Sequence, residues 1–135
     1  MTHPHRPNPL FLVVALSALA AGCAAPPPAP PPTGLAEVME RPAERALLEG
    51  IRAYDDAQYA QAEKALRKAL ADGLQSARDR ATAHKLLAFI TCTSDRLADC
   101  QTQFREARAA DASFALSRSE AGHPVWGPVY KSLAQ

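Results

Sequence analysis

The distribution of proline divides this chain into a part that can build a core and a part that cannot. Nine of its 12 prolines lie at or before Pro32, and the others are Pro42, Pro124 and Pro128. Proline has no backbone N–H and a fixed φ, so it is excluded from the interior of helices and sheets. We therefore expect the folded domain at 35–135, a length that suits one small domain.

The first 22 residues have the pattern of an export signal. Residues 1–9 include Arg6 and two histidines, and residues 10–21 form an uncharged apolar run, LFLVVALSALAA. A run of about 12 residues is shorter than the roughly 20 that span a bilayer. This pattern is typical of a cleaved signal peptide and not of a transmembrane helix.

The segment from Leu19 to Cys23, LAAGC, resembles the lipobox of bacterial lipoproteins. It departs from the family pattern at Ala20, where leucine is most common. The resemblance implies cleavage before Cys23 and acylation of its thiol, with palmitate among the acyl chains. Ala24 in the next position resembles the signal that sorts lipoproteins to the outer membrane, facing the periplasm. An ordinary secretory signal that leaves an unpaired cysteine is the alternative.

Residues 23–34 are predicted to be a lipidated linker. The prolines from Pro26 to Pro32 favour polyproline II, which at about 3.1 Å per residue spans roughly 22 Å. The formal net charge of the whole chain is +1, and cleavage would remove Arg6. Neither a nucleic acid nor a membrane surface would be held by charge, so membrane attachment depends on the acyl chains.

The body beyond Leu35 has the apolar spacing of helices and is predicted to be all-α. Pro42 suits a first turn, and Leu47, Ile51 and Tyr54 form a stripe on the helix that follows it. Asp55 and Asp56 mark a turn, after which a second helix is expected over residues 58–71, with Gly73 as its C-terminal cap.

Small and large residues in this body recur at the intervals of tetratricopeptide (TPR) repeats, a helical-hairpin family with a 34-residue unit. A first repeat covers residues 43–76, and a more degenerate second covers 81–114 after a connection longer by four residues. The residues that carry the resemblance are Gly50, Tyr59, Ala62, Leu66 and Ala69, then Leu87, Ala88, Leu97, Cys100, Phe104 and Ala107. An unrelated antiparallel helix bundle is the alternative.

Two repeats are fewer than the three or so that a solenoid needs to bury a continuous core. Further burial is therefore expected from residues 35–40, from residues 125–134, from oligomerisation or from a covalent staple. Cys92 and Cys100 flank a predicted turn between facing helices, and an exported protein is in an oxidising compartment. A disulfide between them is predicted, worth somewhat under about 3 kcal/mol for so short a loop. A metal site with His84 is the alternative, but no CxxC or HxxxH spacing supports it.

The C-terminal stretch 120–130, EAGHPVWGPVY, contains the sole tryptophan. It is predicted to be an ordered loop followed by a short helix that begins at Pro128. Trp126 and Tyr130 then either cap the last repeat or anchor a partner, because aromatic side chains are enriched at binding hot spots. His123 is expected to be a hydrogen-bonded loop residue that belongs with Trp126 and Tyr130 to the same capping or partner-binding group.

Taken together, the lipobox, the proline linker, the two TPR-like units and the ending 120–130 resemble small TPR lipoproteins encoded with type VI secretion systems. The resemblance implies an accessory that contacts subunits of the envelope machine by protein–protein interaction. A scaffold for pilus, outer-membrane or peptidoglycan assembly is the alternative.

An enzyme is not expected, because known nucleophile, phosphate-binding and zinc motifs are lacking and the close acid pairs Asp55/Asp56 and Asp95/Asp99 fall at turns or helix starts. No cofactor or metal is predicted apart from the lipid on Cys23.

Overall fold

The computed structural model describes residue 34 and residues 40–133. The predicted signal peptide, Cys23, the proline tract and residues 35–39 lie outside the described residues. The contacts of the chain separate it into units 1–31 and 32–135, and all of the described residues belong to the second unit. Within the described part this unit is all-α and has no strand.

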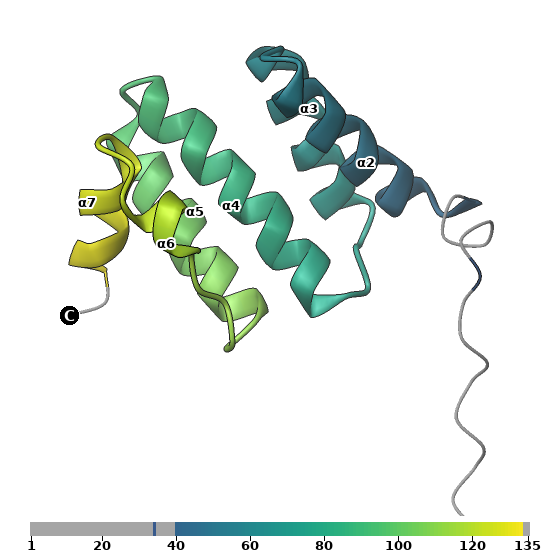
Figure 1. Ribbon diagram of the computed structural model, residues 1–135. Helices are drawn as coiled ribbons and strands as arrows, with labels where there is room; N and C mark the ends of the chain where they lie inside the picture. The colour runs from purple at the N-terminus through teal and green to yellow at the C-terminus, as the bar shows by residue number, and fades with distance from the viewer. Residues whose placement is uncertain (1–33, 35–39, 134–135) are drawn as a thin grey trace, which may run out of the picture. The chain divides into compact units, whose positions relative to one another are not determined.

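Two antiparallel hairpins form the body of the domain, and a shorter pair of helices follows them (Figure 1). The helices are α2 (Pro42–Asp55), α3 (Tyr59–Ala71), α4 (Ala77–Thr93), α5 (Leu97–Ala110), α6 (Arg118–Ala121) and α7 (Trp126–Ser132). Among these helices, none is long and apolar enough to cross a bilayer.

Small side chains let α2 and α3 approach closely in the first hairpin. Gly50 of α2 is buried against Leu66 of α3, and a Cβ on Gly50 would lie 2.7 Å from the Leu66 Cγ. Ala62, Leu66 and Ala69 are fully buried beside it. At the end of α3, Gly73 adopts φ +88°, the left-handed conformation that glycine accepts without strain.

The second hairpin repeats this arrangement with larger buried groups. Cys100, Phe104 and Ala107 of α5 are fully buried against α4. Cys92 and Cys100 are joined by a disulfide, with their Cα atoms 5.1 Å apart. The bond closes the turn in which Asp95 has φ 58°.

The longer connection expected before residue 81 is helical and not a loop. The α4 helix begins at Ala77, and the Ser76 hydroxyl caps it by accepting a hydrogen bond from the Asp79 N–H. Ser76 followed by Asp79 places a cap and an acid at the helix N-terminus, which favours the extra turn.

The two hairpins stack through α3 against α4, and α2 also contacts α4. An ion pair also links the two hairpins. Arg96 Nη1 and Nη2 donate hydrogen bonds to Glu63 Oε1 and Oε2 at 2.9 and 2.6 Å. These hydrogen bonds lower the pKa of Glu63 to about 2 despite the opposing effect of burial.

Two of the residues that carry the repeat resemblance are exposed. Tyr59 and Leu97, the first residues of α3 and α5, are 49% and 54% exposed. Each follows a tight turn, so its side chain leaves the hairpin at the edge and does not enter the core. Tyr59, predicted to pack within the first repeat, packs at its edge against the ring of Tyr54.

The C-terminal helices also differ from expectation. The last helix begins at Trp126, and Pro128 is its third residue, where the missing N–H costs no helical hydrogen bond. A short helix, α6, precedes it and was not expected. A capping box holds it: Ser117 Oγ accepts from the Glu120 N–H, and Glu120 Oε2 accepts from the Ser117 N–H.

Candidate functional site

Five rings from three parts of the domain lie next to one another in one series, two of the contacts being face-to-face stacks. The order is Tyr59, Tyr54, Phe89, Trp126 and His123, and we call this series the aromatic row. Successive ring centroids are 5.6, 6.5, 4.2 and 3.3 Å apart. Three of its members, Tyr59, Trp126 and His123, were candidate residues from the sequence, and the structure joins them through Tyr54 and Phe89.

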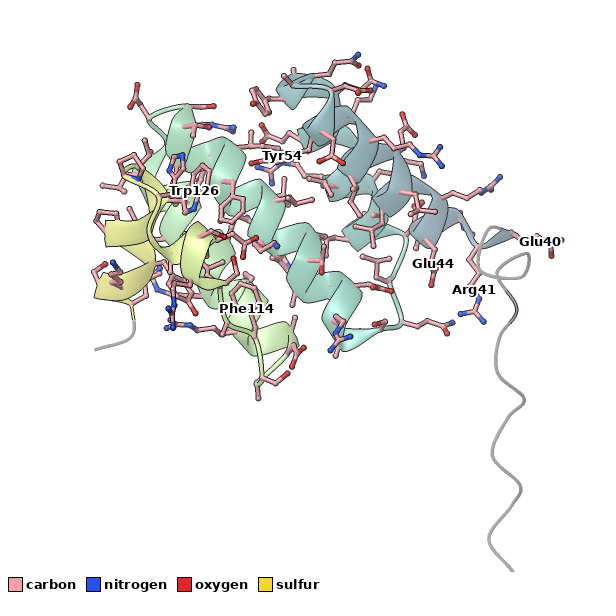
Figure 2. The ribbon with its side chains drawn as sticks, in the orientation of Figure 1. Glu40, Arg41, Glu44, Tyr54, Phe114 and Trp126 are labelled. Atoms are coloured by element: carbon pink, nitrogen blue, oxygen red, sulfur yellow. A yellow bond between two sulfur atoms is a disulfide. The ribbon has the colours of Figure 1, made fainter. Side chains whose placement is uncertain are left out.

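Each hairpin and the C-terminal segment contributes to the row. Tyr54 lies one residue before the end of α2 and Tyr59 begins α3, so the turn between them sets their edge-to-face contact. Phe89 comes from α4. In Figure 2, α4 runs between the labelled residues Tyr54 and Trp126. The row therefore exists only where both hairpins and the C-terminal segment are packed together.

Phe89 anchors the row while its neighbours reach the surface. Phe89 is 4% exposed, whereas Tyr59 is 49% exposed and Tyr54, Trp126 and His123 are half-buried. Half-buried aromatic rings keep apolar area for a partner at a low cost in side-chain entropy. The row has the composition of a protein-binding surface.

Hydrogen bonds fix the orientation of Trp126. Its Nε1–H donates to the backbone oxygen of Glu120 at 2.9 Å. The Glu120 carboxylate in turn accepts from Lys85 Nζ at 2.6 Å, and this ammonium lies 5.8 Å from the Phe89 ring centroid. Burial raises the pKa of Glu120, but the hydrogen bonds from Lys85 and Ser117 outweigh it and leave the pKa below its usual value.

Tyr54 places a phenol among the apolar rings of the row. Burial raises the pKa of Tyr54, and the neighbouring Tyr59, Asp55 and Glu120 raise it further. The phenol is therefore protonated throughout the neutral range, and the row offers a polar tip beside its apolar rings.

Tyr130 lies in a branch of rings that joins the row through Phe104, whose ring centroid is 6.2 Å from that of Phe89. The Tyr130 ring meets Phe104 at 5.3 Å and Phe114 at 6.2 Å, and its hydroxyl accepts from the Leu116 N–H at 3.3 Å. The Arg108 guanidinium lies 4.7 Å from the Tyr130 ring centroid. Tyr130 therefore packs α7 against α5 as a cap.

Among the described residues, no three histidine, cysteine, aspartate or glutamate side chains lie close enough together to hold a metal ion. His84 Nδ1 is hydrogen-bonded to Gln103 Oε1 at 2.8 Å. Asp55 and Asp56 end α2, and Asp99 lies in the first turn of α5 with Arg96 4.0 Å away. Asp99 suits the dipole at the N-terminus of α5, whereas Asp55 and Asp56 stand at the C-terminus of α2, where the dipole does not favour an acid.

Phe89, Lys85 and Glu120 were not identified from the sequence as site residues. Phe89 lies within an apolar run that also fits a core helix. The pairing of Lys85 with Glu120 joins residues 35 positions apart, which no local pattern reveals. The sequence did offer a signal for Glu120, because Ser117 followed three residues later by glutamate has the spacing of a capping box.

No known protein family, curated protein or solved structure matches the chain.

Proposed function

We propose that this protein is an adaptor lipoprotein of the outer membrane that faces the periplasm and serves as an accessory of a type VI secretion system. The acyl anchor on Cys23 would hold it in the membrane. A TPR-like domain of two repeats would recruit a subunit of the envelope machine by protein–protein contact.

The aromatic row is the observation that carries the adaptor role. It presents two pairs of partly exposed rings, Tyr59 with Tyr54 and Trp126 with His123, on either side of the buried Phe89, and paired aromatic anchors of this kind suit a partner helix or extended peptide.

Three features support the TPR-like assignment of the scaffold. Small buried residues, Gly50 in α2 and Ala62 and Ala69 in α3, stand where the two helices of the first hairpin meet. The first helices of the two hairpins, α2 and α4, contact each other as they would in a stacked repeat array. The α7 helix covers α5 and α4, in the manner of the capping element that ends such arrays.

The adaptor role is tested by crosslinked affinity purification of the full chain from the envelope of a bacterium with a type VI secretion system. We expect recovery of a subunit of that machine by the unchanged chain, and at least about fivefold lower recovery by Tyr59→Ala, since a hot-spot side chain contributes roughly 1 kcal/mol or more. Tyr59 stands at the exposed end of the row, so its loss leaves the fold intact.

Leu97→Ala is the matched control. Leu97 is also the first residue of the second helix of its hairpin and is similarly exposed, but it is not a member of the row. Equal recovery by the Tyr59 and Leu97 variants would remove the row from the binding surface. Recovery of pilus or peptidoglycan-assembly proteins in place of secretion subunits would move the adaptor to another envelope process.

A further inference from the structure

The exposed face of α2, which borders α3, carries a charge series without ion-pair partners among the described residues. Arg45, Glu49, Arg52 and Asp56 follow each other at helical spacing, so all four project from one face. Their signs alternate and their sum is zero. Among residues 40–133, none of the four has an ion-pair or side-chain hydrogen-bond partner.

The neighbouring helix α3 is arranged differently. In α3, Glu63 and Arg67 pair at 2.7 Å and Lys68 pairs with Asp72 at 2.6 Å, both four residues apart. Arg45 with Glu49 and Arg52 with Asp56 have the same spacing and stay unpaired, so this series of charges on α2 has no partner within its own helix.

The same four side chains line a hollow of about 380 Å³ on the first hairpin. Leu48, half-buried, contributes an apolar wall, and Gln58 and Gln61 of α3 form a polar edge. A second hollow of about 510 Å³ continues from Glu49 along α3 to Lys68. The exposed surface that α2 and α3 share is therefore hollowed.

We propose that this surface binds a second copy of the chain, with the two α2 helices antiparallel about a two-fold axis. In that arrangement Arg45 faces Asp56 of the second copy and Glu49 faces its Arg52, and the symmetry repeats both contacts. Every charge of the series then meets the opposite sign. A uniformly acidic or basic partner would meet repulsion at half of the four positions, so the alternation selects the chain itself.

The dimer also supplies burial that two hairpins lack. The opposite end of the stack is covered by α7, whereas in the described residues the exposed face of α2 has no covering helix. Antiparallel helices packed at about 20° bring long side chains of facing positions together over several turns. Four charge pairs along roughly 16 Å of helix fit that geometry.

The test is co-purification of two differently tagged copies of the full chain expressed together in one bacterium. Unchanged copies should co-purify. Glu49→Arg places like charges opposite Arg52 of the second copy, and Arg52→Glu places like charges opposite Glu49. Each variant should therefore lose self-association by at least about tenfold.

A mixed pair separates charge matching from misfolding. When one copy carries Glu49→Arg and the other Arg52→Glu, both contacts become attractive again, and co-purification should return to the level of the unchanged chain. The double variant Glu49→Arg/Arg52→Glu should likewise associate with itself. Restored association also shows that each variant is folded.

The matched controls are Arg105→Glu and Glu106→Arg on α5, two exposed residues without an ion pair among the described residues. Both should co-purify with themselves as the unchanged chain does. The proposal is overturned if unchanged copies do not co-purify, if the single variants associate as well as the unchanged chain, or if the mixed pair stays apart.

Discussion

Gly50 sets the distance between the two helices of the first hairpin. A Cβ at this position would meet Leu66 Cγ at 2.7 Å, Leu66 Cδ2 at 2.8 Å and the Leu66 backbone nitrogen at 3.2 Å. Leu66 is fully buried, so its side chain has no open space into which it can move.

We therefore predict that Gly50→Ala destabilises the domain by about 1–3 kcal/mol, the usual cost of overpacking a filled core. Urea unfolding followed by circular dichroism measures the change. Gly122→Ala is the control, because a Cβ there would lie 3.4 and 3.5 Å from its two nearest atoms, at ordinary contact distance. Similar free energies of unfolding for the two variants would contradict the tight contact.

Glu63 is the residue whose charge state couples the hairpins. Its folded pKa is about 2, below the ordinary value of 4.5, because Arg96 and then Arg67 donate hydrogen bonds to it. A carboxylate with a lowered folded pKa stabilises the native state above its unfolded pKa, and this contribution is lost as pH falls towards the folded value.

We predict that Glu63→Gln lowers the free energy of unfolding by about 1 kcal/mol at pH 7, since the pair is near the surface. The difference from the unchanged chain should shrink as pH falls from about 4.5 to 2. Urea titrations at stepped pH give the profile, with Asp72→Asn in the local pair of α3 as the comparison. A difference that stays constant down to pH 2 would mean that the ion pair contributes nothing.

At the scale of the elements, the helical content could be read from the sequence because periodicity and caps are local. Pro42 in the first turn of α2 and Gly73 after α3 mark boundaries that the structure has. The first turn of α4 was missed because the second repeat was placed from residue 81 by its spacing, and the capping residue Ser76 was not considered. Tyr59 was expected to pack within the repeat because spacing alone does not tell the edge of a hairpin from its interior.

The candidate site was only partly predictable for the same reason. Trp126, His123 and Tyr59 could be singled out by residue type, but their connection runs through Phe89, which has no distinguishing local signal. The split between Trp126 in the row and Tyr130 in the cap depends on the direction of α7, which only long-range packing sets.

The contact between α6 and α7 holds Trp126 in place. A Cβ on Gly127 would lie 2.6 Å from the backbone oxygen of Ala121, so the two helices can approach only because this residue is glycine. Trp126 immediately precedes it and stacks on Phe89.

We predict that Gly127→Ala moves α7 away from α6 and exposes Trp126. The fluorescence of this sole tryptophan should shift to longer wavelength, while far-ultraviolet circular dichroism stays near that of the unchanged chain. Pro128→Ala, which adds no atom at the contact, serves as the control. An unchanged emission spectrum in Gly127→Ala would show that the helix pair tolerates the added methyl group.

At the scale of the whole molecule, the three cysteines divide between a disulfide and the proposed lipid anchor. Cys92 and Cys100 are joined within the domain, which leaves Cys23 for the acyl anchor in the proposed function. These tasks can be separated by substitution, because the anchor and the disulfide act on different properties of the chain.

We predict that Cys23→Ser shifts the protein from the membrane fraction to the soluble periplasmic fraction, since no net charge would hold the processed chain at a bilayer. The double variant Cys92→Ala/Cys100→Ala, which keeps Cys23, should stay with the membrane. Immunoblots of separated fractions measure both. Persistence of the Cys23 variant in the outer-membrane fraction would disprove the lipid anchor.

The aromatic row has one further consequence for how the protein works in a cell. Its end members, Tyr59 and His123, are far apart in the sequence, and its middle ring comes from between them. A chain that loses its C-terminal segment to a protease, or that has not finished folding, keeps its helical hairpins but presents an interrupted surface. A partner that binds the protein through the row would therefore bind intact copies in preference to truncated or incompletely folded ones.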